Sequence, residues 1–149
     1  MVVLAALTVV SWVPSMPRPL MPVPAPAELP SAVAAEVPSG TTMLFVPCAS
    51  SSSAAGMYYQ AVDGFHWSLV AGYAYYQSAG APVAASLCNS RSTETEPQGS
   101  ALMAALRREG VGVIMVPPNA AADAARITAA TGRSPLMLDR FSMWVIGAP

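Results

Sequence analysis

Seven prolines between residues 14 and 30 constrain how the first part of this chain can fold. They occupy positions 14, 17, 19, 22, 24, 26 and 30 of the segment P-S-M-P-R-P-L-M-P-V-P-A-P-A-E-L-P. Each proline ring restricts the backbone angle φ and removes an amide donor, so a helix cannot continue through such spacing. The segment is therefore predicted to be an extended, polyproline-like spacer. A proline-rich signalling ligand is the alternative interpretation, and the apolar residues between the prolines disfavour it.

The segment before the spacer, residues 1–13, is the uncharged apolar run M-V-V-L-A-A-L-T-V-V-S-W-V. It is too short to cross a bilayer, which needs about 20 helical residues. We interpret it as the end of a transmembrane helix that begins upstream, with Trp12 at the membrane interface. A signal peptide is the second interpretation. Residues 25–27, A-P-A, are acceptable for cleavage, but no basic leading region is present. A core helix of a soluble domain is the third.

The charge content limits the partners of the chain. Only 10% of the 149 residues are charged, against roughly 25% in typical soluble proteins. The seven basic residues are all arginines, are scattered along the sequence and leave a formal net charge of -1. Nucleic acid is therefore excluded as a partner, because no basic stripe is present to meet the phosphates. So few charges also make a poor surface for a free cytosolic protein.

Residues 31–149 are predicted to form one small α/β domain. Apolar runs predict strands over 41–46, 111–116, 136–138 and 142–146, and helical spacing predicts helices over 31–36, 54–63, 100–109 and 119–131. Ser100 and Asn119 are the expected N-caps of the last two helices. The polar stretch 77–98 is expected to be a surface loop. Alternation of strands with helices predicts a small, mostly parallel sheet flanked by helices, with an antiparallel final strand at an edge.

Cys48 offers two interpretations. It follows the first predicted strand and precedes a helix, where a thiol pKa is lowered, so it is a candidate nucleophile with His66 as its base. The competing interpretation is a disulfide between Cys48 and Cys88, which suits a domain outside the cytoplasm. The sequence does not supply the geometry that would decide between them.

Other site chemistries have little support. One histidine and two distant cysteines offer no metal-ligand spacing, so no metal is predicted. The serines at positions 50–53 precede a helix and are able to hold an anion there, but no glycine-rich phosphate loop with a lysine accompanies them. The carboxylates form no catalytic pair. No cofactor is predicted.

Residues 57–76, M-Y-Y-Q-A-V-D-G-F-H-W-S-L-V-A-G-Y-A-Y-Y, contain all five tyrosines, the single histidine and Trp67. Aromatic faces of this kind are able to stack on sugars. The core of a small domain is the favoured interpretation, because Tyr58 joins an apolar helix face. In addition, aromatic and apolar residues alternate as in a half-buried strand, at positions 65, 67, 69 and 73.

Part of this block carries a resemblance. Met57, Gln60-Ala61, Gly64-Phe65, Trp67, Leu69 and Gly72-Tyr73 follow the pattern M-x-x-Q-A-x-x-G-[FM]-x-[FW]-x-L-x-x-G-Y. The run resembles one in the C-terminal extracytoplasmic region of large actinobacterial polytopic membrane proteins. Those proteins are similar to GT-C type glycosyltransferases, which use lipid-linked sugar donors in building the cell envelope. The resemblance covers roughly residues 28–147, and its specific motif spans about 17 positions.

The resemblance implies a function without catalysis in this chain. The catalytic carboxylate of such families is expected in an early loop beside the first membrane helices, and this sequence has no counterpart to it. The chain is then expected to be a non-catalytic outer domain, or a fragment, on the extracytoplasmic side of the cell membrane. Its implied partners are the membrane portion of the parent protein and an envelope glycan or lipid-linked sugar. The candidate docking or binding residues are Gln60, Gly64, His66, Trp67, Gly72 and Tyr73. A small exported enzyme using Cys48 and His66, or a sugar-binding module, is the alternative.

Overall fold

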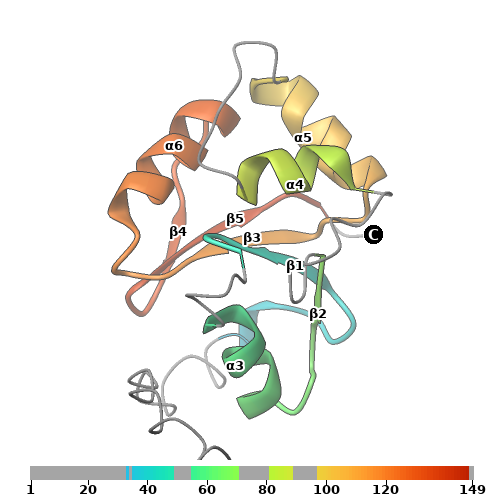
Figure 1. Ribbon diagram of the computed structural model, residues 1–149, viewed down its shortest axis with the longest axis vertical. Coiled ribbons are helices and arrows are strands. Elements are labelled where there is room, and N and C mark those ends of the chain that lie inside the picture. Colours follow the sequence, from blue (N-terminus) through green and yellow to red (C-terminus); the bar gives the residue numbers. More distant parts are fainter. Residues whose placement is uncertain (1–32, 34, 49–54, 71–80, 89–96, 148–149) are drawn as a thin grey trace, which may run out of the picture.

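The computed structural model describes residues 33, 35–48, 55–70, 81–88 and 97–147. These residues contain five strands and four helices with defined bounds (Figure 1). In chain order they are β1 (Thr42–Phe45), α3 (Ala55–Val62), β2 (Ser68–Leu69), α4 (Pro82–Cys88), α5 (Gly99–Arg108), β3 (Val113–Val116), α6 (Ala121–Thr131), β4 (Leu136–Leu138) and β5 (Phe141–Val145). The apolar run 1–13, the spacer 14–30 and the serines at 50–53 lie outside the described residues.

The strands form one mixed sheet in the order β2-β1-β3-β5-β4. β1 pairs in parallel with β2 and β3, whereas β5 pairs antiparallel with both β3 and β4. The prediction of an α/β domain is confirmed, but the prediction of a mostly parallel sheet is wrong. β5 is antiparallel as expected, yet it lies inside the sheet and β4 forms the edge.

The β4–β5 hairpin gives the physical reason for this correction. Leu138 pairs directly with Phe141, so only Asp139 and Arg140 connect the two strands. Asp139 has a left-handed φ of 54°, which tight hairpins require. A two-residue connection allows only antiparallel pairing, whereas a parallel pair needs a long crossover. A periodic pattern identifies a strand but contains no information on its direction.

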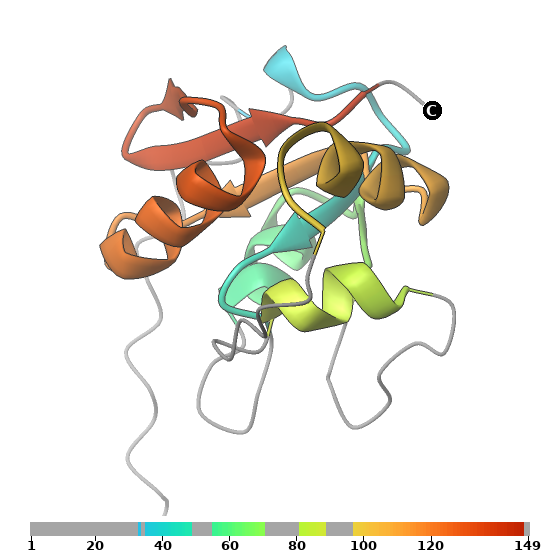
Figure 2. The same ribbon diagram turned by 90° about the horizontal axis from the view of Figure 1, so that it is seen from above.

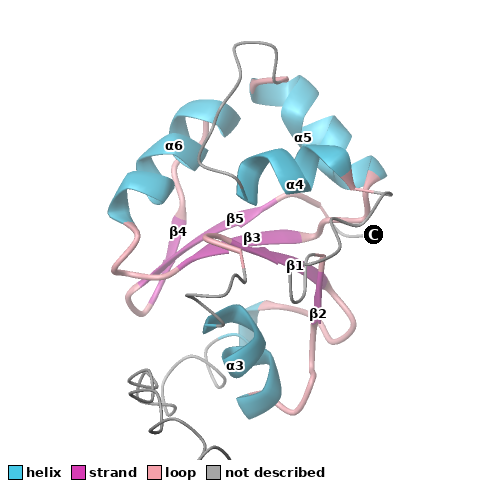
Figure 3. Cartoon of the chain, in the orientation of Figure 1, coloured by secondary structure: helices cyan, strands magenta, loops and turns pink. Residues whose placement is uncertain are grey.

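Helices cover both faces of the sheet, which makes three layers (Figures 1 and 3). Helices α4, α5 and α6 lie over one face, as the view from above also shows (Figure 2), and α3 lies on the other. The alternation of strand side chains explains both cores. Leu44, Ile114 and Trp144 face the three helices, whereas Met43, Met115 and Met143 face α3. The central strand β3 is buried along its whole length, as its uninterrupted apolar sequence predicts.

Helix α4 contradicts the prediction that 77–98 is a loop. Pro82 opens the helix at the position where its missing amide hydrogen costs least, and Ala84 and Leu87 are buried under α5. The predicted caps were also misplaced. Ser100 lies inside α5, and Asn119 lies one residue before the N-cap position of α6. The N-cap residues are Gln98 for α5 and Ala120 for α6, and neither makes a side-chain capping bond.

No helix within the described ranges combines the length and the apolar character needed to span a membrane.

Candidate functional site

The α3–β2 turn, residues 63–67, lies between the helix and the strand that carry the motif. The amide of Asp63 donates to Tyr59 O at 3.0 Å, and the amide of Phe65 donates to Gln60 O at 2.9 Å. Gly64 and Phe65 both have a φ of 62°, in the left-handed region. Glycine adopts this conformation easily and phenylalanine does so rarely. Two consecutive left-handed residues reverse the chain sharply and direct it into β2.

Gln60 and His66 hold the turn in place. The side-chain amide of Gln60 donates to Trp67 O at 3.0 Å. The His66 Nε2 atom lies 3.1 Å from Val37 O, and this carbonyl accepts a hydrogen bond only when Nε2 carries the proton. The His66 carbonyl also accepts from the amide of Gly40 at 2.9 Å. Gln60 therefore ties α3 to the turn, and His66 ties the turn to the segment that enters β1, which gives both residues structural roles.

Trp67 is a core residue and not an exposed platform. Its side chain is only 1% exposed and packs with Met43, Tyr59 and Val37. Among the described residues, two buried side-chain polar atoms have no hydrogen-bond partner, Trp67 Nε1 and Asp63 Oδ2. Both belong to this turn. A buried polar atom without a partner costs free energy, so the turn is not arranged for maximum stability.

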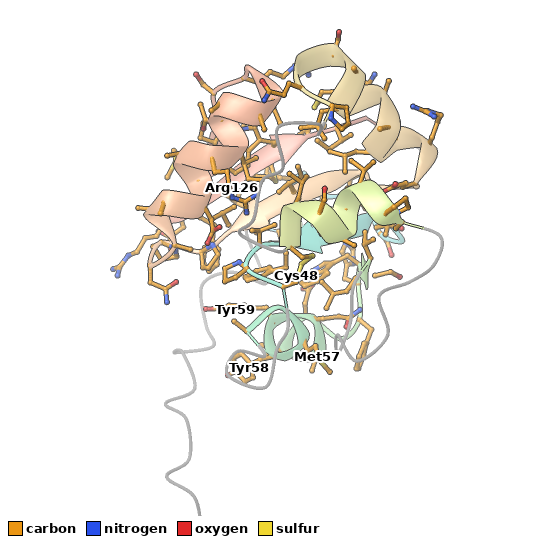
Figure 4. All side chains as sticks on the ribbon, turned by 45° about the horizontal axis from the view of Figure 1, so that its top comes forward. Cys48, Met57, Tyr58, Tyr59 and Arg126 are labelled. Carbon is orange, nitrogen blue, oxygen red and sulfur yellow. A yellow bond between two sulfur atoms is a disulfide. The ribbon has the colours of Figure 1, made fainter. Side chains whose placement is uncertain are left out.

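The two tyrosines of α3 differ in burial, although their rings contact each other edge-on at 5.6 Å between centroids. Tyr59 points toward the sheet and is buried, whereas Tyr58 is half-buried on the outer side of the helix (Figure 4). The Tyr59 ring meets Phe141 edge-on at 5.4 Å between centroids and packs against Phe45 at 5.9 Å. Burial raises the pKa of the Tyr59 phenol, and the neighbouring Tyr58 raises it further. Tyr59 is therefore part of the core, which leaves Tyr58 as the accessible tyrosine of the helix.

The other candidate docking residues fall elsewhere. Gly64 occupies the left-handed position described above, where its missing side chain is needed for the backbone angle. Gly72 and Tyr73 lie outside the described residues. Phe65 differs from the prediction that it alternates inward with Trp67, because its left-handed backbone turns the ring outward, where it is 69% exposed.

Cys48 and Cys88 form a disulfide that joins the segment after β1 to the end of α4. Their Cα atoms are 5.1 Å apart across a sequence separation of 40 residues. No described cysteine is free. Because a bonded sulfur provides no thiolate, the structure does not support Cys48 as a nucleophile. His66 is also committed to a backbone carbonyl on the α3 side of the sheet, whereas Cys48 packs in the core under α4.

Helix α4 is held at both ends by charged side chains from distant positions. The Glu109 carboxylate accepts from the amides of Val83 and Ala84, each at 2.8 Å, at the N-terminus of α4. Arg126 donates to Leu87 O at 2.7 Å near the C-terminus and pairs with Asp123 at 3.0 Å. A carboxylate at the first turn and a guanidinium at the last complement the helix dipole. Sequence reasoning missed both residues, because each acts on a helix far away in the chain.

The described residues do not assemble the catalytic or metal-binding groups that the sequence suggested as candidates. Within the described residues no group of three metal-ligating side chains is close enough to hold an ion. The structure likewise brings together no nucleophile and base there: Cys48 is oxidised and His66 holds a backbone carbonyl. The described part of the motif builds a turn that presents one exposed aromatic ring, Phe65.

Comparisons with protein families, with curated proteins and with solved structures found no match to this chain.

Proposed function

We propose that this chain is a non-catalytic extracytoplasmic domain, or a fragment, of a membrane protein similar to the GT-C glycosyltransferases of cell-envelope biogenesis. The observation that carries the proposal is the disulfide between Cys48 and Cys88. Disulfides persist in oxidising compartments and are rare in the cytosol. A domain with this bond, with 10% charged residues and with a proline-rich spacer after an apolar run suits the outer side of a membrane.

The motif supports a scaffolding role for this part of the chain. Gln60, Gly64, His66 and Trp67 build and fasten the α3–β2 turn, and none of them is free to act on a substrate. The proposed partners are the membrane portion of the parent protein and an envelope glycan or lipid-linked sugar. Transfer of sugar is assigned to that membrane portion.

Neither alternative function gains a specific observation. An exported enzyme using Cys48 and His66 needs a thiolate, which the disulfide removes. A sugar-binding module needs accessible aromatic faces. Trp67 and Tyr59 are buried, so the accessible rings of the described part of the block are Tyr58 and Phe65.

The compartment is tested by trapping thiols in the native host. Cells are quenched in acid, and the denatured chain is treated with a maleimide that adds measurable mass. We expect no modification of Cys48 or Cys88 unless the sample is reduced first. A Cys88→Ser variant is the control, because its unpaired Cys48 must take up one label. Labelling of both cysteines without prior reduction places the domain in a reducing compartment and refutes the proposal.

The parent protein is tested by reading the genomic DNA upstream of the Met1 codon. An open frame encoding further hydrophobic spans is the expected result. A stop codon and a ribosome-binding site immediately before Met1 contradict a polytopic parent.

A further inference from the structure

Helix α3 is apolar on both sides although the sheet covers only one of them. Its sequence, A-G-M-Y-Y-Q-A-V, contains no charged residue. Gly56 and Tyr59 are buried against the sheet. The outer side carries Met57, Tyr58, Ala61 and Val62, which are half-buried or exposed and follow helical spacing. A helix that is apolar all round is normally covered on every side, and no described helix or strand covers the outer side of α3.

Phe65 extends this surface beyond the end of the helix. It is 69% exposed, and its neighbour Val62 is 41% exposed. Phe65 also holds a left-handed φ of 62°, a conformation that glycine and asparagine adopt more easily. Neither burial nor backbone preference accounts for a phenylalanine at this position. Backbone strain and unpaired buried atoms concentrate at functional segments, and this turn has both features.

Charge is distributed unequally between the two sides of the sheet. The helical layer on the opposite face carries Arg107 and Arg108 on α5 and Arg126 on α6. Helix α3 and the α3–β2 turn contain no arginine among their residues, and their one charged residue is Asp63. Water is therefore removed from the outer side of α3 and from Phe65 at a low electrostatic cost.

The chain also enters the domain on the α3 side. Val33 and Val37 are buried in the cluster that includes Tyr59 and Trp67 of the α3 layer. The spacer of residues 14–30 precedes this entry point, and the apolar run 1–13 precedes the spacer. A polyproline spacer rises about 3.1 Å per residue, so 17 residues in that form would reach about 50 Å. An anchor at residues 1–13 thus keeps the α3 side within reach of the membrane that holds the anchor.

We propose that the outer side of α3 together with Phe65 is a membrane-contact surface that inserts into the headgroup region of a zwitterionic bilayer. The inference rests on the proposed function for the membrane anchor. The surface, which we call the α3 face, consists of Met57, Tyr58, Ala61, Val62 and Phe65. Figure 4 shows Met57 and Tyr58 on the side of α3 that is turned away from the sheet.

A lipid surface suits the α3 face better than a protein partner does. The α3 face carries no charged side chain, and the tyrosine hydroxyl is the one polar side-chain group among its five residues. A tyrosine beside aliphatic side chains is typical of the membrane interface, where the ring is apolar and the hydroxyl meets water. Without basic residues, the affinity of the α3 face for a bilayer is weak. The anchor holds the face at a high local concentration near the membrane, which makes this weak binding effective.

The test compares hydrogen–deuterium exchange of the full chain with and without phosphatidylcholine vesicles. We expect exchange across residues 58–66 to slow about threefold when two-thirds of the protein molecules have the α3 face bound to vesicles. A Phe65→Asn variant is expected to lose this protection while it unfolds at the same or a higher urea concentration, because asparagine tolerates the left-handed φ. Adding phosphatidylglycerol is expected to give no further protection, since the surface has no cation.

Met137→Asn is the matched control. Met137 is 63% exposed but lies on β4, where it contacts Ser142 on the sheet face opposite to α3. This variant must keep the protection of residues 58–66. Equal exchange with and without vesicles refutes the inference and indicates a protein partner for the α3 face. Protection that persists in Phe65→Asn, or that depends on anionic lipid, refutes it as well.

The two proposals fail in different ways. If thiol trapping places the domain outside the cytoplasm but vesicles do not protect residues 58–66, only the membrane-contact surface is wrong. If trapping finds free thiols, the proposed function is wrong whatever the vesicles show.

Discussion

Removing both cysteines tests how much the disulfide stabilises the domain. The double variant Cys48→Ala, Cys88→Ala deletes the bond between the region after β1 and the end of α4. Cys48 is buried and Cys88 is half-buried, so replacement by alanine removes little apolar contact. Glu109 and Arg126 still bind the two ends of α4. The native structure is therefore expected to persist, and the main change is in the unfolded chain.

The expected magnitude follows from the length of the loop that the bond closes. Opening a loop with a sequence separation of 40 residues returns conformational entropy to the unfolded chain. The chain-entropy relation gives about 4 kcal/mol for a loop of this length. Since small domains are stable by about 5–15 kcal/mol, the variant is expected to lose a large part of its free energy of unfolding. It should nevertheless fold at low temperature.

Urea unfolding followed by circular dichroism measures this loss. With a slope of about 2 kcal/mol per molar urea, the midpoint is expected to fall by about 2 M. Dithiothreitol must lower the midpoint of the wild type by a similar amount and must leave the double variant unchanged. A loss below about 1 kcal/mol in the variant refutes the reasoning, because it shows that the closed loop does not restrict the unfolded chain.

Three further predictions concern single side chains. Glu109→Ala is expected to lower the free energy of unfolding by about 2 kcal/mol, because two amides of α4 lose a charged acceptor. Gly56→Ala is expected to destabilise by about 1 kcal/mol despite its better helix propensity, since the added Cβ would lie 2.9 Å from Phe45 Cβ. The raised pKa of Tyr59 predicts stability that is complete below its ordinary value of 10.0 and is lost as the pH rises through the folded value. Tyr59→Phe should weaken that alkaline dependence.

Urea unfolding distinguishes the outcomes for these variants. Glu109→Gln keeps one acceptor oxygen and should lose less stability than Glu109→Ala, and equal losses contradict the capping role. A stabilised Gly56→Ala variant shows that Phe45 moves away freely. If stability falls at alkaline pH by the same amount in Tyr59→Phe and in the wild type, groups other than Tyr59 cause that fall.

Local features of the sequence were enough to place most of the regular elements. The apolar runs locate β1, β3, β4 and β5 to within about two residues, and the helical spacing locates α3, α5 and α6. Both patterns are properties of adjacent residues. The pairing of Cys48 with Cys88 was one of two open interpretations, and the structure has the bond.

The missed features depend on residues far apart in the chain. Helix α4 has a proline at its first position, a signal that was available, but its capping carboxylate comes from Glu109, 26 residues away. The roles of Gln60 and His66 could not be read from the motif, because their partners are backbone carbonyls. A motif records residue types and spacing and contains no information on these contacts.

The sequence by itself determined the periodic patterns of apolar residues. These patterns predict strands that are apolar on both faces, and such strands need helices to cover them, which makes an α/β domain. The tertiary structure decided the antiparallel pairing of β4, the position of β5 inside the sheet and the outward ring of Phe65. The physical reason is that burial patterns arise from neighbouring residues, whereas strand direction and the exposure of one turn residue arise from connections and packing between distant segments.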